Sequence, residues 1–455
     1  MSYRTQSLYL EIGVRNETKR SNQRYRMSDN AYYHGSERVV LDTDEAKIKL
    51  THRLRQYIEL RNFSLLVGNG CSIPLGAPLI HDTAKITPEL DVAPYRLNDP
   101  KEHDTARLLL DSLLPKDAPL GIERLLTLLA SIQATEEIVG QPVEVNKLAI
   151  EARDARLLDQ LLKKWLFHRC RVVSEVDDGA LQSHQELLRR ILLRSTTLPR
   201  AKVFTTNYDL AIERALDALG VVYFNGFLGT ISRTLRTESY HYDLYYPGET
   251  TEGRVSRVDR VLHLYKLHGS INWRRRDARA GDVVMTHSSP RHDNFGNVMI
   301  YPSPLKVTEM NGYPYSEMFR HFSAQLHQPQ SVLLTIGYKF QDDHLNRIIY
   351  QALSIPSFVL IVVTPTIDSP GSGEPTRTEH EIWRLTTLDS KRILVITGAD
   401  KDNSGMYVSG AGTIQDFSHI WLPDISELNV EAAAREDARK ALAPLTSPPP
   451  IDNGK

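Results

Sequence analysis

The sequence predicts an α/β fold, a doubly wound parallel Rossmann-like sheet with a large helical insertion. Three observations predict it. Short apolar runs end at glycine or polar residues, segments of helical period lie between these runs, and one long helical stretch separates the first two runs. Strands that alternate with helices are typical of parallel sheets covered on both faces. A helical stretch too long for a simple crossover indicates an insertion.

The composition excludes several classes of protein. The chain has 455 residues, 41% hydrophobic and 24% charged, with a formal net charge of -1 and two cysteines. This hydrophobic content excludes a wholly disordered chain. Two cysteines exclude a disulfide scaffold and a four-cysteine zinc site. The near-zero net charge argues against a protein that coats nucleic acid, so we expect nucleic acid to be an indirect partner at most.

No targeting or membrane segment is recognisable. The first twenty residues lack the apolar core of a secretion signal. The longest purely apolar run, Phe358–Val363, is far shorter than the ~20 residues needed to span a bilayer. We therefore expect a cytoplasmic protein without membrane contact.

The first elements follow from period and polarity. Residues 1–40 are polar without a clear period and are predicted to form an N-terminal arm for oligomer or partner contact. From Asp44, apolar residues recur at helical spacing, as at Leu50 and Leu54. The apolar run Phe63–Val67 then reads as a buried strand that feeds a glycine loop.

Residues 99–195 are predicted to form a helical insertion subdomain. Leucine pairs recur there at helical spacing, as at Leu125–Leu126 and Leu161–Leu162, and charged residues fill the positions between them.

Strands and helices alternate over the rest of the chain. Strands are predicted at Ala201–Thr205, Val258–Leu267, Val298–Tyr301, Ser331–Ile336, Ser357–Val363 and Arg392–Ile396, and helices at Leu210–Leu219, Ser316–Gln325, Asp343–Leu353 and Glu379–Leu388. Residues 228–256 and 274–297 read as loops, and 423–455 as a C-terminal helix with a disordered tail. The basic run Arg274–Arg279 is either a solvated loop or a contact for nucleic acid or an acidic partner.

The first polar cluster is Gly68–Ser72, directly after a strand. A glycine turn there can bring backbone N–H groups to a pyrophosphate. A third glycine is missing because Ile73 stands in its place, so the fingerprint of hydride-transferring enzymes fails. The alternative is a tight structural turn.

Two further clusters follow the next strands. Asn207 and Asp209 lie after Thr205, where they could orient a ligand or bind a ribose hydroxyl, or else cap the following helix. His268 is suited to act as a general base, and Gly269 lets a ligand approach the backbone. The alternative for His268 is a structural hydrogen-bonding residue.

The fourth cluster, Gly337–His344, again begins with a glycine at the end of an apolar strand. Helix capping by Asp342 is an alternative to a binding role here.

In this order, the four clusters resemble the sirtuin-like NAD-binding family, and most closely its bacterial NAD hydrolases of antiviral defence. The resemblance implies an NAD-binding domain over 41–98 and 196–422, with NAD as the substrate. It implies catalytic roles for Asn207, His268 and Asp209. The NAD-contacting residues that it implies are Gly68, Asn69, Gly70, Cys71, Ser72, Thr206, Gly269, Gly337 and Tyr338.

Two departures from the deacylases of this family change the expected reaction. Their Asp-Phe-Arg segment is replaced by APLIHD at 77–82, and their four-cysteine zinc module is missing, since only Cys71 and Cys170 are present. We expect no zinc, because His287, His292 and Asp293 do not form a recognised ligand pattern.

The resemblance thus implies an NAD hydrolase that releases nicotinamide and ADP-ribose, with His268 as base, Asn207 placing ribose or water, and Asp209 ordering the site. The alternatives are an NAD-binding regulatory subunit and an NAD-dependent deacylase. The resemblance also implies a homo-oligomer and an activating partner, such as a HerA-like ATPase or a short Argonaute.

Overall fold

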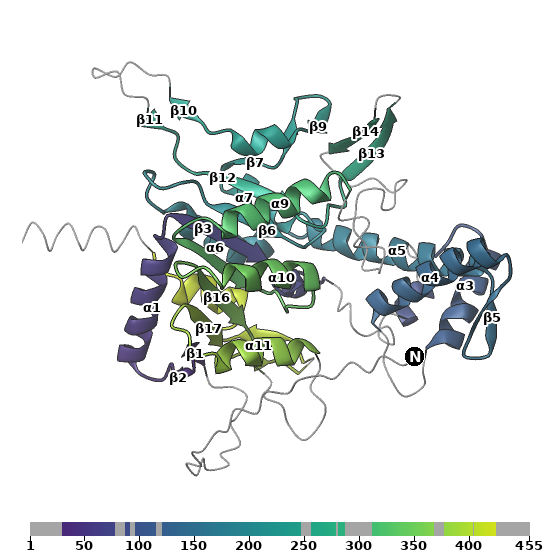
Figure 1. Ribbon diagram of the computed structural model, residues 1–455, viewed down its shortest axis with the longest axis horizontal. Coiled ribbons are helices and arrows are strands. Elements are labelled where there is room, and N and C mark those ends of the chain that lie inside the picture. The colour runs from purple at the N-terminus through teal and green to yellow at the C-terminus, as the bar shows by residue number, and fades with distance from the viewer. Residues whose placement is uncertain are drawn as a thin grey trace, which may run out of the picture.

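A computed structural model describes residues 30–77, 87–91, 96–114, 121–246, 256–278, 281–286, 312–367, 377–403 and 405–424. Within these ranges the largest sheet has nine strands, in the order β2-β1-β17-β16-β15-β3-β6-β12-β7 (Figure 1). The parallel strands are β3 (Asn62–Val67), β6 (Lys202–Thr205), β7 (Val222–Phe224), β12 (Val261–Lys266), β15 (Ser331–Ile336), β16 (Val359–Thr364) and β17 (Ile393–Thr397).

The strand order is that of a doubly wound sheet. From β3 the chain adds β6, β7 and β12 on one side, with β7 at the edge, and then returns to the other side of β3 to add β15, β16 and β17. The order reverses between β3 and β15, and in such sheets ligands bind at the carboxyl ends of the strands near this point. The predicted fold class is confirmed.

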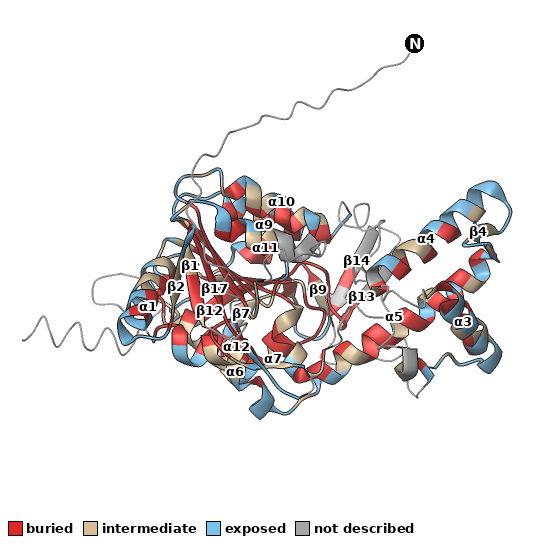
Figure 2. Cartoon of the chain, turned by 90° about the horizontal axis from the view of Figure 1, so that it is seen from below, coloured by how far each residue is buried: buried red, intermediate tan, exposed pale blue. Residues whose placement is uncertain are grey.

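Helices cover both faces of the sheet because alternate side chains of each strand point to opposite sides. Leu65 and Val67 pack with α1 (Asp44–Ile58), α6 (Gln182–Leu192) and α7 (Ala211–Ala218). Leu66 packs on the other face, with α9 (Tyr315–Leu326), α10 (Asp343–Ala352) and α11 (Arg377–Thr387). Figure 2 shows the result, with the central strands buried and the helices buried only on one side.

Local signals explain where these helices begin. The Thr43 side chain accepts the N–H of Ala46 at 3.2 Å and so caps α1, whose Leu50, Leu54 and Ile58 form one buried stripe. The helix ends at Ile58. After a short turn, β3 begins at Asn62 and starts the parallel part of the sheet.

The helical segment contains α3 (Pro100–Leu113), α4 (Ile122–Val139), α5 (Ala152–Ser174) and a hairpin of β4 (Val143–Val145) and β5 (Leu148–Ile150). These helices share a core that also includes Tyr208, Leu210 and Ile271 from the loops of the sheet. In both views they lie on the side of the molecule away from α1 (Figures 1 and 2). The insertion was predicted to extend to residue 195, yet α6 packs on the sheet through Leu187 and Leu188.

The edge of the sheet differs from the prediction. Residues 31–40, grouped with the arm above, form β1 (Ala31–His34) and β2 (Glu37–Val40), and these strands extend the sheet antiparallel to β17. The hairpin lacks an apolar run because it lies at an edge of the sheet, and in its two strands only Ala31 and Tyr32 are buried. Residues 1–29 lie outside the described part.

Two regions predicted as loops contain short strands. β13 (Trp273–Ala278) and β14 (Gly281–Thr286) pair as a hairpin, so the basic run from Arg274 begins in a strand. A small sheet joins β14 to β9 (Arg233–Leu235) and β8 (Phe227–Leu228), while β10 (Tyr245–Tyr246) pairs with β11 (Ser256–Arg257). The strand predicted at Val298–Tyr301 and the C-terminal helix and tail from residue 425 lie outside the described residues.

Among the described helices, none combines the length and the apolar character needed to cross a bilayer. The remaining elements are short: β18 (Asp400–Lys401) pairs with β19 (Tyr407–Ser409), and α12 (Ile414–Asp416) leads into the π-helical turn Phe417–Trp421.

Candidate active site at the carboxyl edge of the sheet

The four polar clusters begin at one edge of the sheet. Val67 is paired with Thr205 on one side and with Ile336 on the other, and Thr205 is paired with Lys266. The strands β15, β3, β6 and β12 are neighbours in this order and run parallel. The residues that follow these four positions therefore leave the sheet at the same level, which brings all four clusters to its carboxyl edge.

The glycine loop after β3 packs directly on the loop after β15. The N–H groups of Gly68 and Gly70 donate to the carbonyls of Ile336 and Gly337, each at 2.9 Å. A Cβ on Gly68 would lie 2.4 Å from the Gly337 carbonyl oxygen, and one on Gly70 would lie 2.7 Å from the Gly337 Cα. Glycine is thus required here by contact between two loops, and these two N–H groups are already used within the protein.

The next residues of the loop are also turned inward. The Cys71 thiol is buried and contacts the Ile336 carbonyl oxygen at 3.5 Å, and burial raises its pKa above the ordinary range of a thiol. Ser72 is buried, and its Oγ accepts a hydrogen bond from Asn207 at 3.0 Å. Asn69 lies in the single turn Asn69–Cys71 and is partly exposed. These contacts leave the Cys71 thiol unsuited to act as a nucleophile.

Asn207 is held in one orientation. Its Nδ2 donates to the Gly68 carbonyl oxygen at 3.2 Å and to Ser72 Oγ at 3.0 Å, and its backbone N–H donates to Thr205 Oγ1. A backbone carbonyl can only accept, so the amide nitrogen must face Gly68. The other edge of the amide, Oδ1, is buried and has no hydrogen-bond partner among the described residues. A buried acceptor of this kind is expected to bind a donor from a ligand or water.

Asp209 lies two residues further on and is buried. Its Oδ1 accepts the N–H of Ala211 at 3.0 Å, so it secures the start of α7, as the capping alternative predicts. Its backbone oxygen accepts a hydrogen bond from Lys266 Nζ, which also lies 3.1 Å from Glu213 Oε1. Asp209 therefore orders the loop that carries Asn207. Thr206, between the strand and Asn207, is only partly buried, and its N–H donates to the Val67 carbonyl.

His268 lies two residues after the end of β12, the next strand of the sheet. It is 7% exposed, and its Nε2 lies 3.0 Å from Asp342 Oδ2. The rings of Tyr208 and Phe319 lie 6.3 and 6.4 Å away, centroid to centroid. Gly269 follows with φ +81°, a left-handed conformation that favours glycine. The histidine is thus enclosed by two aromatic rings and a carboxylate.

The hydroxyl group of Tyr338 is used in a hydrogen bond within the protein. It is buried and donates to Asn346 Oδ1 at 2.8 Å inside α10, and burial raises its pKa well above the usual range. The hydroxyl therefore fixes the Gly337 loop to α10, on the same side as Asp342.

Two residues that contact this site, Asp342 and Ser174, were not predicted to do so. Asp342 was considered only as a helix cap, and Ser174, whose Oγ accepts the N–H of Leu210 at 2.8 Å, was not considered. The only available signal for Asp342 was its position after a strand end. Ser174 terminates α5, and no sequence pattern relates it to a residue in the loop after β6.

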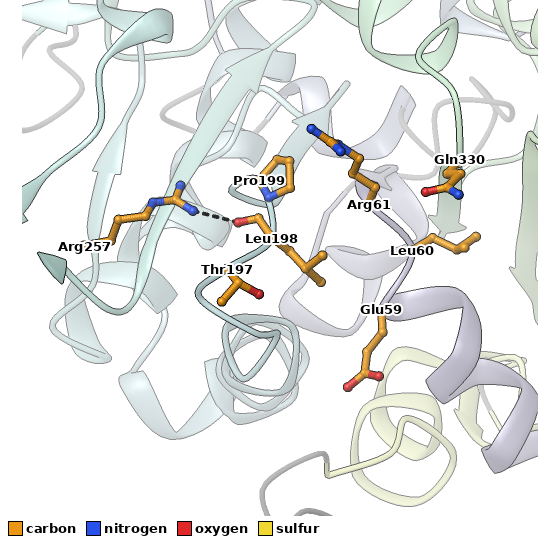
Figure 3. A pocket seen from close by; sticks show the side chains of 8 residues that line it. All are labelled: Glu59, Leu60, Arg61, Thr197, Leu198, Pro199, Arg257 and Gln330. Atoms are coloured by element: carbon orange, nitrogen blue, oxygen red, sulfur yellow. Dashed lines mark hydrogen bonds between the residues drawn. The ribbon is translucent and has the colours of Figure 1, made fainter. Parts of the chain in front are cut away.

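A cavity of about 570 Å³ lies elsewhere, at the opposite edge of the sheet (Figure 3). Its lining comes from the segments that precede β3, β6 and β15, together with Arg257. Arg257 donates there to the Leu198 carbonyl oxygen at 2.8 Å. The lining residues are Glu59, Leu60, Arg61, Thr197, Leu198, Pro199, Arg257 and Gln330. This cavity is separate from the four clusters, because they lie at the carboxyl ends of the same strands.

In the part of the chain that the structure describes, no three or more His, Cys, Asp or Glu side chains gather where they could hold a metal ion. His287, His292 and Asp293 lie outside that part.

Residues 201–387, less than half of the chain, match the family model of the SIR2-like domain. No curated protein matches this sequence. Among solved structures, a Sir2 homologue with NAD is 14% identical, with a TM-score of 0.33, over 78% of this chain and 94% of its own. A mutant Sir2 homologue in complex with 2'-O-acetyl ADP-ribose is also 14% identical, with a TM-score of 0.31, over 74% of this chain and 94% of its own.

Proposed function

We propose that this protein hydrolyses NAD at the bond between nicotinamide and ribose, with Asn207 and His268 as the reacting side chains. The observation that carries the proposal is the oriented amide of Asn207, whose buried Oδ1 has no partner among the described residues. A ribose hydroxyl or a water molecule would supply the missing donor. The SIR2-like domain match over 201–387 includes Asn207, Asp209, His268 and Gly337, and it supports NAD as the substrate.

The chemistry follows from the leaving group. The nicotinamide ring of NAD is a cation and departs as a neutral molecule. The transition state therefore develops positive charge on the ribose. Asn207 Oδ1 accepts a hydrogen bond from the attacking water or from a ribose hydroxyl and so fixes its position. His268 takes the proton as the water oxygen bonds to the ribose carbon and the bond to nicotinamide breaks. The products are nicotinamide, ADP-ribose and one proton.

Asp209 has an indirect role in this proposal. Its carboxylate holds the first turn of α7, and its backbone oxygen is held by Lys266. The loop that carries Asn207 is therefore ordered before substrate binds, which lowers the entropy cost of reaching the reactive geometry.

The biological role proposed here rests on the resemblance alone. We infer that the protein depletes NAD in antiviral defence, as a homo-oligomer that is switched on by a partner such as a HerA-like ATPase or a short Argonaute. The mass of the protein in solution, measured with and without the product of a neighbouring gene, tests this, together with NAD turnover in both states. Turnover that is equal in both states would exclude activation by that partner.

Substitution of the two reacting residues tests the site. Purified protein is incubated with NAD, together with any activating partner, and nicotinamide is measured by chromatography. We expect Asn207→Ala and His268→Ala each to lower the rate by about 100-fold or more. Full turnover in either variant would contradict its assignment.

Matched control variants come from the same chain. Asn62 is the first residue of β3, and its Nδ2 donates to a backbone oxygen, that of Pro329 at 2.8 Å, at the opposite edge of the sheet. His34 lies in β1, far from the site, and its Nε2 donates to the Lys391 carbonyl oxygen at 2.8 Å. Asn62→Ala and His34→Ala should keep the wild-type rate.

A further inference from the structure

Asp342 contacts two different parts of the protein with its two carboxylate oxygens. Oδ1 accepts the N–H groups of His344 at 3.0 Å and Leu345 at 3.4 Å, and so caps α10. Oδ2 lies 3.0 Å from His268 Nε2. Asp342 is 8% exposed and His268 is 7% exposed, so the contact is largely shielded from water. A helix cap needs only one of the two oxygens, and the second is left for the histidine.

The contact joins strands that are not neighbours. His268 follows β12, and Asp342 follows β15, with β3 and β6 between them in the sheet. Three strand spacings correspond to about 14 Å. The loop that leaves β15 must therefore return over the carboxyl edge to reach His268. It is held there by the hydroxyl of Tyr338 on Asn346, and by the amide of Asn346 on the Phe340 carbonyl at 2.7 Å.

We propose that Asp342 is a positioning residue for His268, an inference that rests on the proposed hydrolysis of NAD. The negative charge of a carboxylate 3.0 Å from Nε2 favours the neutral tautomer that carries its proton on that nitrogen. Nδ1 then keeps the lone pair that a base requires. The carboxylate also stabilises the imidazolium that forms when His268 takes a proton, by the same logic as an acid–histidine pair in hydrolases.

The substitution Asp342→Asn separates the two roles of this side chain. Asparagine caps helices about as well as aspartate, so α10 should remain capped and the Tm should be unchanged. The negative charge beside His268 is lost. We expect kcat for nicotinamide release to fall roughly 10- to 1,000-fold, while KM changes less than about threefold, because the residue does not touch the substrate.

Asp99 provides the matched control. It caps α3 in the same way, with its side chain accepting the N–H of Lys101 at 2.8 Å, in the helical segment. Asp99→Asn should leave kcat, KM and Tm as in the wild type. If Asp342→Asn keeps wild-type kcat while the wild type is active, the positioning role is overturned and the proposed function stands.

A second measurement does not depend on activity. The protein contains 16 histidines, so nitrogen-15 spectra of histidine-labelled protein are assigned at His268 with a His268→Gln variant. We expect the wild type to show the tautomer with the proton on Nε2, and Asp342→Asn to show a mixture. An unchanged tautomer in Asp342→Asn overturns the inference. If the tautomer shifts but the wild type releases no nicotinamide, the positioning stands and the proposed function fails.

Discussion

At the scale of single residues, Gly337 shows how closely the two glycine loops approach. Its φ is +64°, and a Cβ there would lie 2.5 Å from the Cys71 backbone nitrogen and 2.8 Å from the Cys71 Sγ. Gly337 therefore faces two constraints, a left-handed backbone and a lack of space. The backbone atoms of the Gly68 loop cannot yield as a flexible side chain would, so the glycine holds the edge of the site in place.

Gly337→Ala should destabilise the protein more than a conformational penalty alone. The control is Gly140→Ala, since Gly140 has φ +72° with no atom within 4 Å of its Cβ position. We expect a cost of about 1 kcal/mol for Gly140→Ala and several-fold more for Gly337→Ala, measured by denaturant unfolding. Equal costs for the two variants would mean that the Gly68 loop moves away freely.

At the scale of elements, a buried ion pair joins β12 to α7 beneath the Asn207 loop. Lys266 is 2% exposed, and its Nζ lies 3.1 Å from Glu213 Oε1. Burial raises the pKa of Glu213, and Lys266 opposes that shift. The same ammonium group donates to the backbone oxygen of Asp209. One cation thus secures a strand, a helix and the loop between β6 and α7.

Lys266→Met should leave the Glu213 carboxylate buried without its partner. We expect a loss of roughly 3 kcal/mol in the free energy of unfolding, together with a lower rate of NAD cleavage, because the Asn207 loop loses an anchor. Lys49→Met is the matched control, since Lys49 forms an exposed pair with Glu45 at 2.6 Å on α1. We expect Lys49→Met to change neither the free energy of unfolding nor the rate of NAD cleavage measurably. Wild-type stability of Lys266→Met would show that the pair is not stabilising.

The elements also show what a sequence can and cannot predict. Strands β3, β6, β12, β15, β16 and β17 were predicted because each is an apolar run that stops at a glycine or polar residue. The hairpin of β1 and β2 was not, since only Ala31 and Tyr32 are buried in its two strands. Likewise, α6 has the same helical period as α5, and only packing shows that α6 lies on the sheet.

In the candidate site, too, some features could be predicted from the sequence and others could not. The position of Asn207 and His268 at one edge of the sheet could be predicted, because residues that follow parallel strands leave the sheet at the same edge. The pairing of His268 with Asp342 could not, since it joins segments far apart in the chain, and side-chain contacts over such distances leave no local pattern. The glycines of the Gly68 loop were predicted either to approach a pyrophosphate or to form a tight turn, and the sequence gives no sign of their close packing against Gly337.

At the scale of the whole molecule, buried histidines make stability depend on pH. His184 on α6 is 1% exposed, and neither ring nitrogen has a partner among the described residues. Burial lowers its pKa to about 4, against the opposing effect of the Asp209 carboxylate. An unfolded histidine titrates near about 6.5, so between these values only the unfolded chain takes up the proton. Stability is therefore full above about pH 6.5 and falls as the pH drops toward about 4.

Replacing His184 should weaken this dependence. We expect the Tm of His184→Leu to fall less than that of the wild type between about pH 7 and about pH 5. His52→Leu serves as the control, because His52 is exposed on α1 in the folded chain. Thermal unfolding monitored by circular dichroism across this range measures the difference. Parallel curves for the wild type and His184→Leu would exclude His184 as a source of acid sensitivity.

The central claim for the whole molecule is that water, and not an acyl-lysine, receives the ribose. The most direct test is nicotinamide release from NAD by the purified full chain, with any activating partner, in the presence and absence of an acyl-lysine peptide. We predict the same rate in both, and loss of that rate in Asn207→Ala. Release that requires the peptide would contradict the proposal in favour of a deacylase. NAD binding by calorimetry without any product would contradict it in favour of a binding subunit.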